Sequence, residues 1–168
     1  MLRLSKLTDY AVVVLVRLSQ GGEAQGVDVQ TLSQASPQTS PGIASSTGIP
    51  EPTVAKVLKA LANAHLVASQ RGARGGYRLT RALHEIPVSD VIAAIDGPIA
   101  LTACVEGSLS SCESSRLCPV AGRWDPVNAA IQSALSGITL ADMQEAAIPR
   151  AFRLPGDAPI PTPHLAAE

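Results

Sequence analysis

Aromatic side chains are scarce in this sequence. Phe, Trp and Tyr make up only 2% of its 168 residues, whereas 46% of the residues are hydrophobic. The interior must therefore be built from Ala, Val, Leu and Ile, which favours a mainly α-helical fold. The length fits one domain, or one small domain with an additional helix for pairing.

Long hydrophobic runs are also missing, and none approaches the length of a membrane span. The apolar run Ala11–Val16 follows Arg3 and Lys6, as in a secretory signal. Asp9 and Arg17 bracket it too closely for that role. The sequence therefore predicts a cytoplasmic protein with no membrane partner.

A net charge of only −1 argues at first against a nucleic-acid partner. The two halves of the chain differ, however. Residues 1–82 hold nine Lys or Arg and four acids, a net of +5, and residues 83–168 hold four and ten, a net of −6. The first half is suited to a polyanion, although two solvated surfaces would give the same counts.

Cysteine is rare, and its three copies make a disulfide framework improbable in a reducing compartment. Cys104, Cys112 and Cys118 are spaced C-x7-C-x5-C in a Ser- and Gly-rich stretch without helical or strand periodicity. Thiolates suit iron–sulfur clusters, zinc or cuprous copper. Structural zinc sites usually have paired cysteines and four protein ligands, so this spacing favours a cluster over zinc or unliganded thiols.

Three thiolates leave the fourth position of a cluster to a carboxylate, a histidine, another chain or a small molecule. A weak fourth ligand exposes the cluster to attack, which suits a sensor. The candidate carboxylates are Glu106, Glu113, Asp125 and the distant Asp9. A solvated acid or a helix cap is the more ordinary role for each of them. The three histidines have no metal spacing with the cysteines: His65, His84 and His164.

Local signals predict a helix-turn-helix in the basic half. Ser5 can cap a helix that runs to about Gln20. A linker of doubtful order follows as far as Ser40, and its residues 27–35 could form a short helix. Ser40 can cap a helix over 41–47, and a Gly-containing turn at 48–50 precedes a helix over about 52–64. The last helix has a buried stripe formed by Val54, Val57, Leu58 and Leu61 and an opposite face formed by Thr53, Lys56, Lys59 and Ala60.

Two strand-like runs follow this helix, at 66–69 and 77–80. The intervening segment 70–76 contains Arg71, Arg74 and three glycines, which predicts a hairpin with a flexible, basic tip. A hairpin directly after a recognition helix is a wing, and its arginines suit a minor groove. The fold class is therefore mainly α, a winged helix-turn-helix with a small β-hairpin wing.

The acidic half is expected to serve pairing and regulation. A helix over about 87–96, stopped by Gly97, precedes the cysteines, and a longer one over about 125–136 follows them. In the longer helix an apolar side needs a partner surface: Trp124, Val127, Ile131 and Leu135. Thr139 and Asp142 can cap a last short helix. The expected division is 1–82 for DNA binding, 83–143 for effector and dimerisation, and 144–168 as a Pro-rich disordered tail.

Several motifs together resemble the IscR/NsrR/RirA family of transcription regulators over roughly residues 1–143. They are the segments 4–11, 48–59 and 71–77 followed by three cysteines. The segments 104–107, 117–119 and 124–125, followed by 139–143, are most similar to the branch that regulates SUF iron–sulfur assembly.

The resemblance implies a homodimer paired by the helix from about Asp125. It also implies that Cys104, Cys112 and Cys118 bind a [2Fe-2S] or [4Fe-4S] cluster. The histidine that some relatives place three residues after the last cysteine is Ala121 here, and the linker at 21–40 is longer than usual. Asp9 matches the aspartate that nitric-oxide-sensing relatives contribute from the partner subunit, so Asp9 leads as fourth ligand.

The predicted function is repression of iron–sulfur assembly or iron homeostasis genes in response to the cluster. A dimer would place two recognition helices in successive major grooves of double-stranded DNA. Phosphate or groove contacts would come from Lys56, Lys59, Arg71 and Arg74, and Glu51 and Thr53 would lie near base edges. The alternatives are a nitric-oxide- or redox-responsive repressor and a winged helix with structural zinc.

An enzyme acting on a small-molecule substrate is not predicted. The sequence has no nucleophile–base constellation, and the glycines at 72, 75 and 76 lie between strands rather than before a helix, unlike a phosphate-binding loop.

Overall fold

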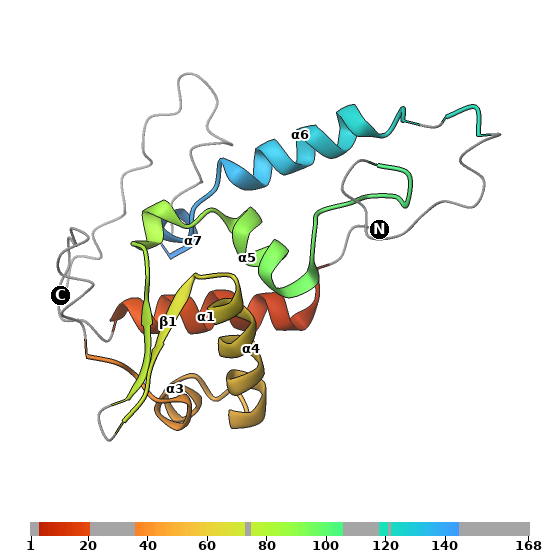
Figure 1. Ribbon diagram of the computed structural model, residues 1–168. Helices are drawn as coiled ribbons and strands as arrows, with labels where there is room; N and C mark the ends of the chain where they lie inside the picture. The colour runs from red at the N-terminus through yellow and green to blue at the C-terminus, as the bar shows by residue number, and fades with distance from the viewer. Residues whose placement is uncertain (1–3, 21–35, 73–74, 106–117, 121, 145–168) are drawn as a thin grey trace, which may run out of the picture.

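Helix α1 (Lys6–Gln20) lies at the centre of the fold. A computed structural model describes residues 4–20, 36–72, 75–105, 118–120 and 122–144. Helices α3 (Ser40–Thr47) and α4 (Glu51–Asn63) pack on one side of α1, and α5 (Val88–Asp96) packs on another (Figure 1). The predicted linker helix at 27–35 and the predicted tail lie outside the described residues.

Helix α1 begins with the predicted cap, because the Ser5 hydroxyl accepts a hydrogen bond from the Thr8 N–H at 3.3 Å. Its other end is closed by a distant residue. The side-chain amide of Gln38 donates to the Arg17 and Leu18 carbonyls at 3.2 and 3.3 Å. Those carbonyls belong to the last turn, where no intrahelical donor is left for them.

The helix-turn-helix has the predicted form with one correction. Thr39, not Ser40, caps α3, and its hydroxyl accepts from the Gly42 N–H at 3.2 Å. Ser40 is already helical, and its own buried hydroxyl has no hydrogen-bond partner among the described residues. Gly48 ends α3 in the left-handed region, at φ 72°, which glycine adopts without strain. The four predicted apolar residues of α4 are buried: Val54, Val57, Leu58 and Leu61.

The wing consists of β1 (Val67–Gln70) and β2 (Gly76–Leu79), one residue away from the predicted bounds. The strands are antiparallel, with Val67 opposite Leu79. Gln38 adds a one-residue third strand, because its N–H and carbonyl both bond to Tyr77, at 2.9 and 2.8 Å. A Cβ at Gly76 would lie 2.6 Å from the Gln38 carbonyl oxygen, so a glycine is needed at this approach.

The remaining elements cover α1 and α5. A 3-10 turn, η1 (Leu83–Glu85), precedes α5, and helices α6 (Asp125–Ser136) and α7 (Leu140–Gln144) come last. Helix α7 contacts η1 and α1, and α6 lies on α5 on the side away from α3 (Figure 1). As predicted, Thr139 and Asp142 cap α7 by bonding to one another's backbone N–H.

The core is aliphatic, as the composition predicts. Its largest fully buried side chains are Leu15, Ile43, Leu58, Leu61, Leu66, Ile86 and Leu140. None of the helices described is both long and apolar enough to cross a membrane. The winged-helix prediction is confirmed by this arrangement of helices and hairpin.

Candidate functional site

The face of α4 opposite the core is polar and exposed. Glu51, Lys56 and Lys59 are exposed there, and Thr53 is half-buried. No side chain caps the start of α4 by a hydrogen bond. The N–H groups of a first turn, with the positive end of the helix dipole, attract anions such as phosphate.

The wing carries a second basic position next to this face. Arg71 follows β1 directly and is exposed, whereas Arg74 lies outside the described residues. Contacts of α1 with α3 and β2 position the wing. Gln38 strengthens this attachment because one residue both closes α1 and pairs with Tyr77 of β2.

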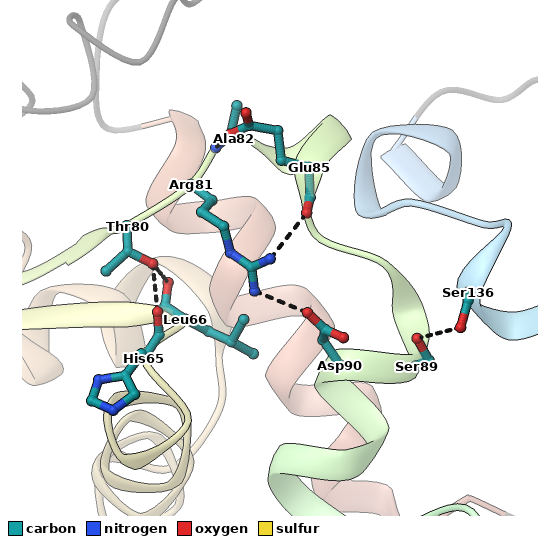
Figure 2. A network of polar contacts seen from close by, with 9 residues as sticks. All are labelled: His65, Leu66, Thr80, Arg81, Ala82, Glu85, Ser89, Asp90 and Ser136. Atoms are coloured by element: carbon teal, nitrogen blue, oxygen red, sulfur yellow. Dashed lines mark hydrogen bonds and ion pairs between the residues drawn. The ribbon is translucent and has the colours of Figure 1, made fainter. Parts of the chain in front are cut away.

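Polar contacts tie the base of the wing to the neighbouring helices (Figure 2). The Thr80 hydroxyl, just after β2, bonds to the carbonyls of His65 and Leu66 at 2.6 and 3.0 Å, which fixes the wing to the end of α4. Arg81 then forms an ion pair with Asp90 of α5 at 2.9 Å. Both side chains are about 40% exposed, so the pair adds orientation more than stability.

The two described cysteines lie between α5 and α6 in sequence. Cys104 and Cys118 are half-buried, and both thiols are free. The Thr102 hydroxyl lies 3.2 Å from the Cys104 sulfur. Cys112 falls outside the described residues, as do Glu106 and Glu113. Free, partly accessible thiols match the donor set of an iron–sulfur cluster.

No group of three His, Cys, Asp or Glu in metal-binding proximity occurs within the described parts of this single chain. Asp9 is exposed in the first turn of α1 and is not brought into such a group with Cys104 or Cys118. Asp125 begins α6, in the position of an acidic residue at a helix N-terminus.

A carboxylate one helix away supports the start of α1. Asp96, the last residue of α5, accepts hydrogen bonds from the Thr8 hydroxyl at 2.7 Å and from the Ser5 N–H at 3.2 Å. Partial burial would raise the pKa of the Asp96 carboxyl, but these bonds favour the charged form and lower its pKa below the ordinary value. The end of α5 and the start of α1 are thereby held together where the cysteine segment departs.

The apolar side of α6 is packed against the fold at one end and exposed at the other. Leu135 packs against the core, and Ile131 is half-buried, whereas Trp124 and Val127 are 42% and 45% exposed. Exposed large apolar groups clustered on one helix are typical of an interaction surface. The prediction that this side needs a partner therefore applies to its first two turns.

Sequence reasoning missed three residues that organise these sites: Gln38, Asp96 and Asn128. Asn128 of α6 is only 4% exposed and hydrogen-bonds to the backbone of the segment before Cys104. Each of the three contacts a residue at least 20 positions away, so no local pattern marks it.

Solved structures with similar folds are transcription regulators. CymR of B. subtilis, described as the global cysteine regulator, is 25% identical with a TM-score of 0.58 over 85% of this chain and 96% of that one. The IscR of T. potens is 30% identical with a TM-score of 0.53 over 85% and 86%.

Relatives in sequence have the same kind of function. An HTH-type transcriptional regulator of Mycobacterium tuberculosis H37Rv is 35% identical over 150 residues, 88% of this chain and 84% of the relative. The HTH-type regulator IscR of Vibrio atlanticus is 34% identical over 119 residues, 71% of this chain and 68% of the relative. All are named as regulators rather than enzymes. Residues 4–146 match the Rrf2 family model, described as iron-dependent transcriptional regulator, and the chain belongs to this family.

Proposed function

We propose that this transcriptional regulator represses genes of iron–sulfur cluster assembly or iron homeostasis, and that a cluster held by its cysteines controls its binding to DNA. The observation that carries the proposal is the placement of two features within one small fold. An exposed basic face on α4 adjoins the wing, and a segment with free thiols departs from the far side of α1. The description of the family as iron-dependent supports an iron effector.

DNA recognition is assigned to α4 and the wing. Glu51 and Thr53, in the first turn, are placed to approach base edges when α4 enters a major groove. Lys56 and Lys59 follow on the exposed face and contact phosphates. Arg71 and Arg74 extend the interface from the wing into the adjacent groove. Phosphate contacts fix the position of the protein, and the base contacts select the sequence.

The effector site is assigned to Cys104, Cys112 and Cys118, with Asp9 of the partner subunit as fourth ligand. An iron–sulfur cluster would supply reversible redox and ligand-exchange chemistry there, and a carboxylate ligand keeps one iron position replaceable. The exposure of Asp9 on the first turn of α1 supports a ligand that reaches a cluster held by the other subunit. Cys104 and Cys118 are half-buried, which limits solvent access at the thiols.

Dimerisation is assigned to α6 through its exposed apolar residues Trp124 and Val127. Two copies related by a two-fold axis present two α4 helices about one DNA turn apart. In this division, residues 1–82 read DNA, and residues 83–143 hold the effector and pair the subunits. As a regulator that acts on chromosomal DNA, the protein is assigned to the cytoplasm.

The proposal is tested by purifying the full chain without oxygen and assaying iron, sulfide and visible absorption. The holo form and the apo form are then each used to select a DNA duplex from a random library. The affinity of each form is measured on each of the two selected duplexes. We expect a coloured protein whose two forms differ at least tenfold in affinity. An effector shifts the DNA equilibrium only by its differential affinity for the two forms, so equal affinities would contradict the proposal.

The same purification separates the alternatives. Stoichiometric zinc, without visible absorption and with DNA binding indifferent to iron, would indicate a winged helix with structural zinc. The coloured protein bound to DNA is then exposed to nitric oxide or to air. Release of the DNA by nitric oxide would indicate a nitric-oxide-responsive repressor, and release by air would indicate a redox-responsive repressor.

A further inference from the structure

Asn128 is a buried polar residue on a helix whose other residues are exposed or half-buried in the described structure. Only 4% of it is exposed. Its side-chain oxygen accepts a hydrogen bond from the Leu101 N–H at 3.0 Å, and its NH2 group donates to the Ile99 carbonyl at 3.0 Å. One turn later, Gln132 donates a second hydrogen bond to the same carbonyl, also at 3.0 Å.

In this pattern one side-chain amide binds two backbone groups of the same short segment. A primary amide presents an acceptor and a donor side by side, which match the carbonyl of one residue and the N–H of the residue two positions later. Both polar ends of Asn128 are thereby used, as a buried amide requires. These hydrogen bonds fix the backbone at 99–101 to α6.

The fixed segment leads directly to a cysteine. Cys104 follows Leu101 by three residues, so the two Cα atoms are at most about 11 Å apart. Val105, the next residue, is buried at 5% exposure. A change in the chain around Cys104 therefore acts on the backbone that Asn128 holds.

At its opposite end α6 is anchored to the core, because Leu135 packs there. The Ser136 hydroxyl donates to the Ser89 hydroxyl of α5 at 3.0 Å, and both groups are accessible (Figure 2). The start of α6 carries the exposed Trp124 and Val127. A shift of residues 99–101 consequently displaces the part of α6 that presents the apolar surface.

We propose that Asn128 is a positioning residue that couples the cysteine segment to α6. When the segment reorders on gaining or losing its effector, the paired amide transmits the displacement to α6 and so to the spacing of the two α4 helices in the dimer. The signalling role rests on the proposed function. The attachment of 99–101 to α6 does not, and it is measurable without any effector.

The first test is hydrogen exchange of the Leu101 amide in the apo protein. We expect the Leu101 amide to be protected in the wild type and in Ser133→Ala, which changes an exposed residue of α6 and serves as the control. Gln132→Ala is expected to show weaker protection. Asn128→Leu is expected to lose the protection. In Asn128→Asp a carboxylate oxygen still accepts from the Leu101 N–H but cannot donate to Ile99, so Leu101 is expected to stay protected while the contact with Ile99 is lost. Unchanged Leu101 protection in Asn128→Leu, or an equal loss of protection in Asn128→Leu and Ser133→Ala, would overturn the attachment.

The second test compares DNA affinities of holo and apo forms. We expect Asn128→Leu to bind as much iron as the wild type, while its holo-to-apo affinity ratio falls to near one. If Asn128→Leu keeps the holo-to-apo affinity ratio of the wild type, the coupling is overturned. It is also overturned if Asn128→Leu loses its iron while Ser133→Ala keeps it. If the wild type holds no iron, the proposed function fails and the signalling role fails with it, while the Leu101 protection still decides whether Asn128 fixes the segment. Should Asn128→Leu not fold, Asn128→Asp, which loses the contact with Ile99, is used instead, with the same expected fall in the holo-to-apo affinity ratio.

Discussion

At the scale of single residues, polar side chains with distant partners organise this protein. Asp96 holds the start of α1, Gln38 closes its end, and Asn128 fixes the chain before Cys104. Each partner lies 20 or more positions away in sequence, and each contact gives an outcome that can be measured.

The Asp96 contact makes folding stability depend on pH. Because hydrogen bonds lower the pKa of Asp96 in the folded state, the contact stabilises the fold above the pKa of the unfolded chain. This contribution is lost as pH falls through the folded value. Asp96→Asn should remove it and cost less than about 1 kcal/mol at neutral pH, because Asp96 is exposed.

Chemical unfolding of the apo protein from pH 7 to pH 3 checks this expectation. Thr8→Val, which removes the 2.7 Å donor, should flatten the same part of the profile. If the free energy of unfolding falls with pH as steeply in both variants as in the wild type, Asp96 does not contribute to the pH dependence of stability.

Thr102 is expected to tune the proposed cluster. Its hydroxyl lies 3.2 Å from the Cys104 sulfur and can donate to an iron-bound thiolate. A hydrogen bond to sulfur stabilises the more reduced cluster. Thr102→Val should lower the midpoint potential by about 40 mV, equivalent to about 1 kcal/mol for one electron. An anaerobic redox titration measures this shift. Thr102→Ser keeps the hydroxyl and is the control, so its midpoint potential should equal that of the wild type.

At the scale of elements, the sequence predicted most of what local patterns can carry. The buried stripe of α4, the Ser5 cap and the reciprocal Thr139–Asp142 cap all hold in the structure. The error at the start of α3 is instructive, because Thr39 and Ser40 are adjacent and both can cap a helix. Only the backbone conformation of Thr39, extended at ψ 153°, decides between them.

The candidate site was predictable only in part. Lys56, Lys59 and Arg71 are exposed, as their helical and turn positions suggest. The third strand at Gln38 was not predictable, because its partner Tyr77 is far along the chain and a single bridging residue has no periodicity. Sequence reasoning treated the wing glycines as a flexible tip, whereas Gly76 is needed for a close backbone approach.

Gly76→Ala should therefore disturb the wing. Its Cβ would lie 2.6 Å from the Gln38 carbonyl oxygen and 2.8 Å from the carbonyl carbon, so backbone must move. We expect a loss of about 1–3 kcal/mol in the free energy of unfolding. We also expect weaker DNA binding, because Arg71 is attached to this hairpin. Ser69→Ala, at an exposed position of β1, is the matched control, and equal stability of the two variants would be the contrary result.

At the scale of the whole molecule, the elements proposed to read DNA and the segment proposed to bind the effector lie on different sides of α1. Helices α3 and α4 pack on one side, and α5 carries α6 on another (Figure 1). The wing is joined to α5 through Arg81 and Asp90, and α5 is joined to α6 through Ser89 and Ser136 (Figure 2). These contacts form a continuous connection, and whether it carries coupling is a matter for measured affinities.

The pairing of subunits can be tested on α6. Val127→Glu places a charge on the exposed apolar side and should give a monomer at micromolar concentration by analytical ultracentrifugation. Its affinity for a two-half-site duplex should fall by about 100-fold, because the second contact is no longer intramolecular. Ala129→Glu lies on the other flank of the helix, about 200° away, and should leave the dimer intact. Equal behaviour of the two variants would place the interface elsewhere.

The attachment of Gln38 to the end of α1 also has a practical consequence for engineering this protein. Gln38 bonds to the carbonyls of Arg17 and Leu18, so the chain leaves α1 and re-enters the fold at neighbouring points. The ends of a loop closed in this way stay together whatever its length, and each doubling of length costs only about 0.6 kcal/mol. A fluorescent or affinity module inserted between residues 21 and 35 is therefore expected to report on the protein without altering α4, the proposed recognition helix.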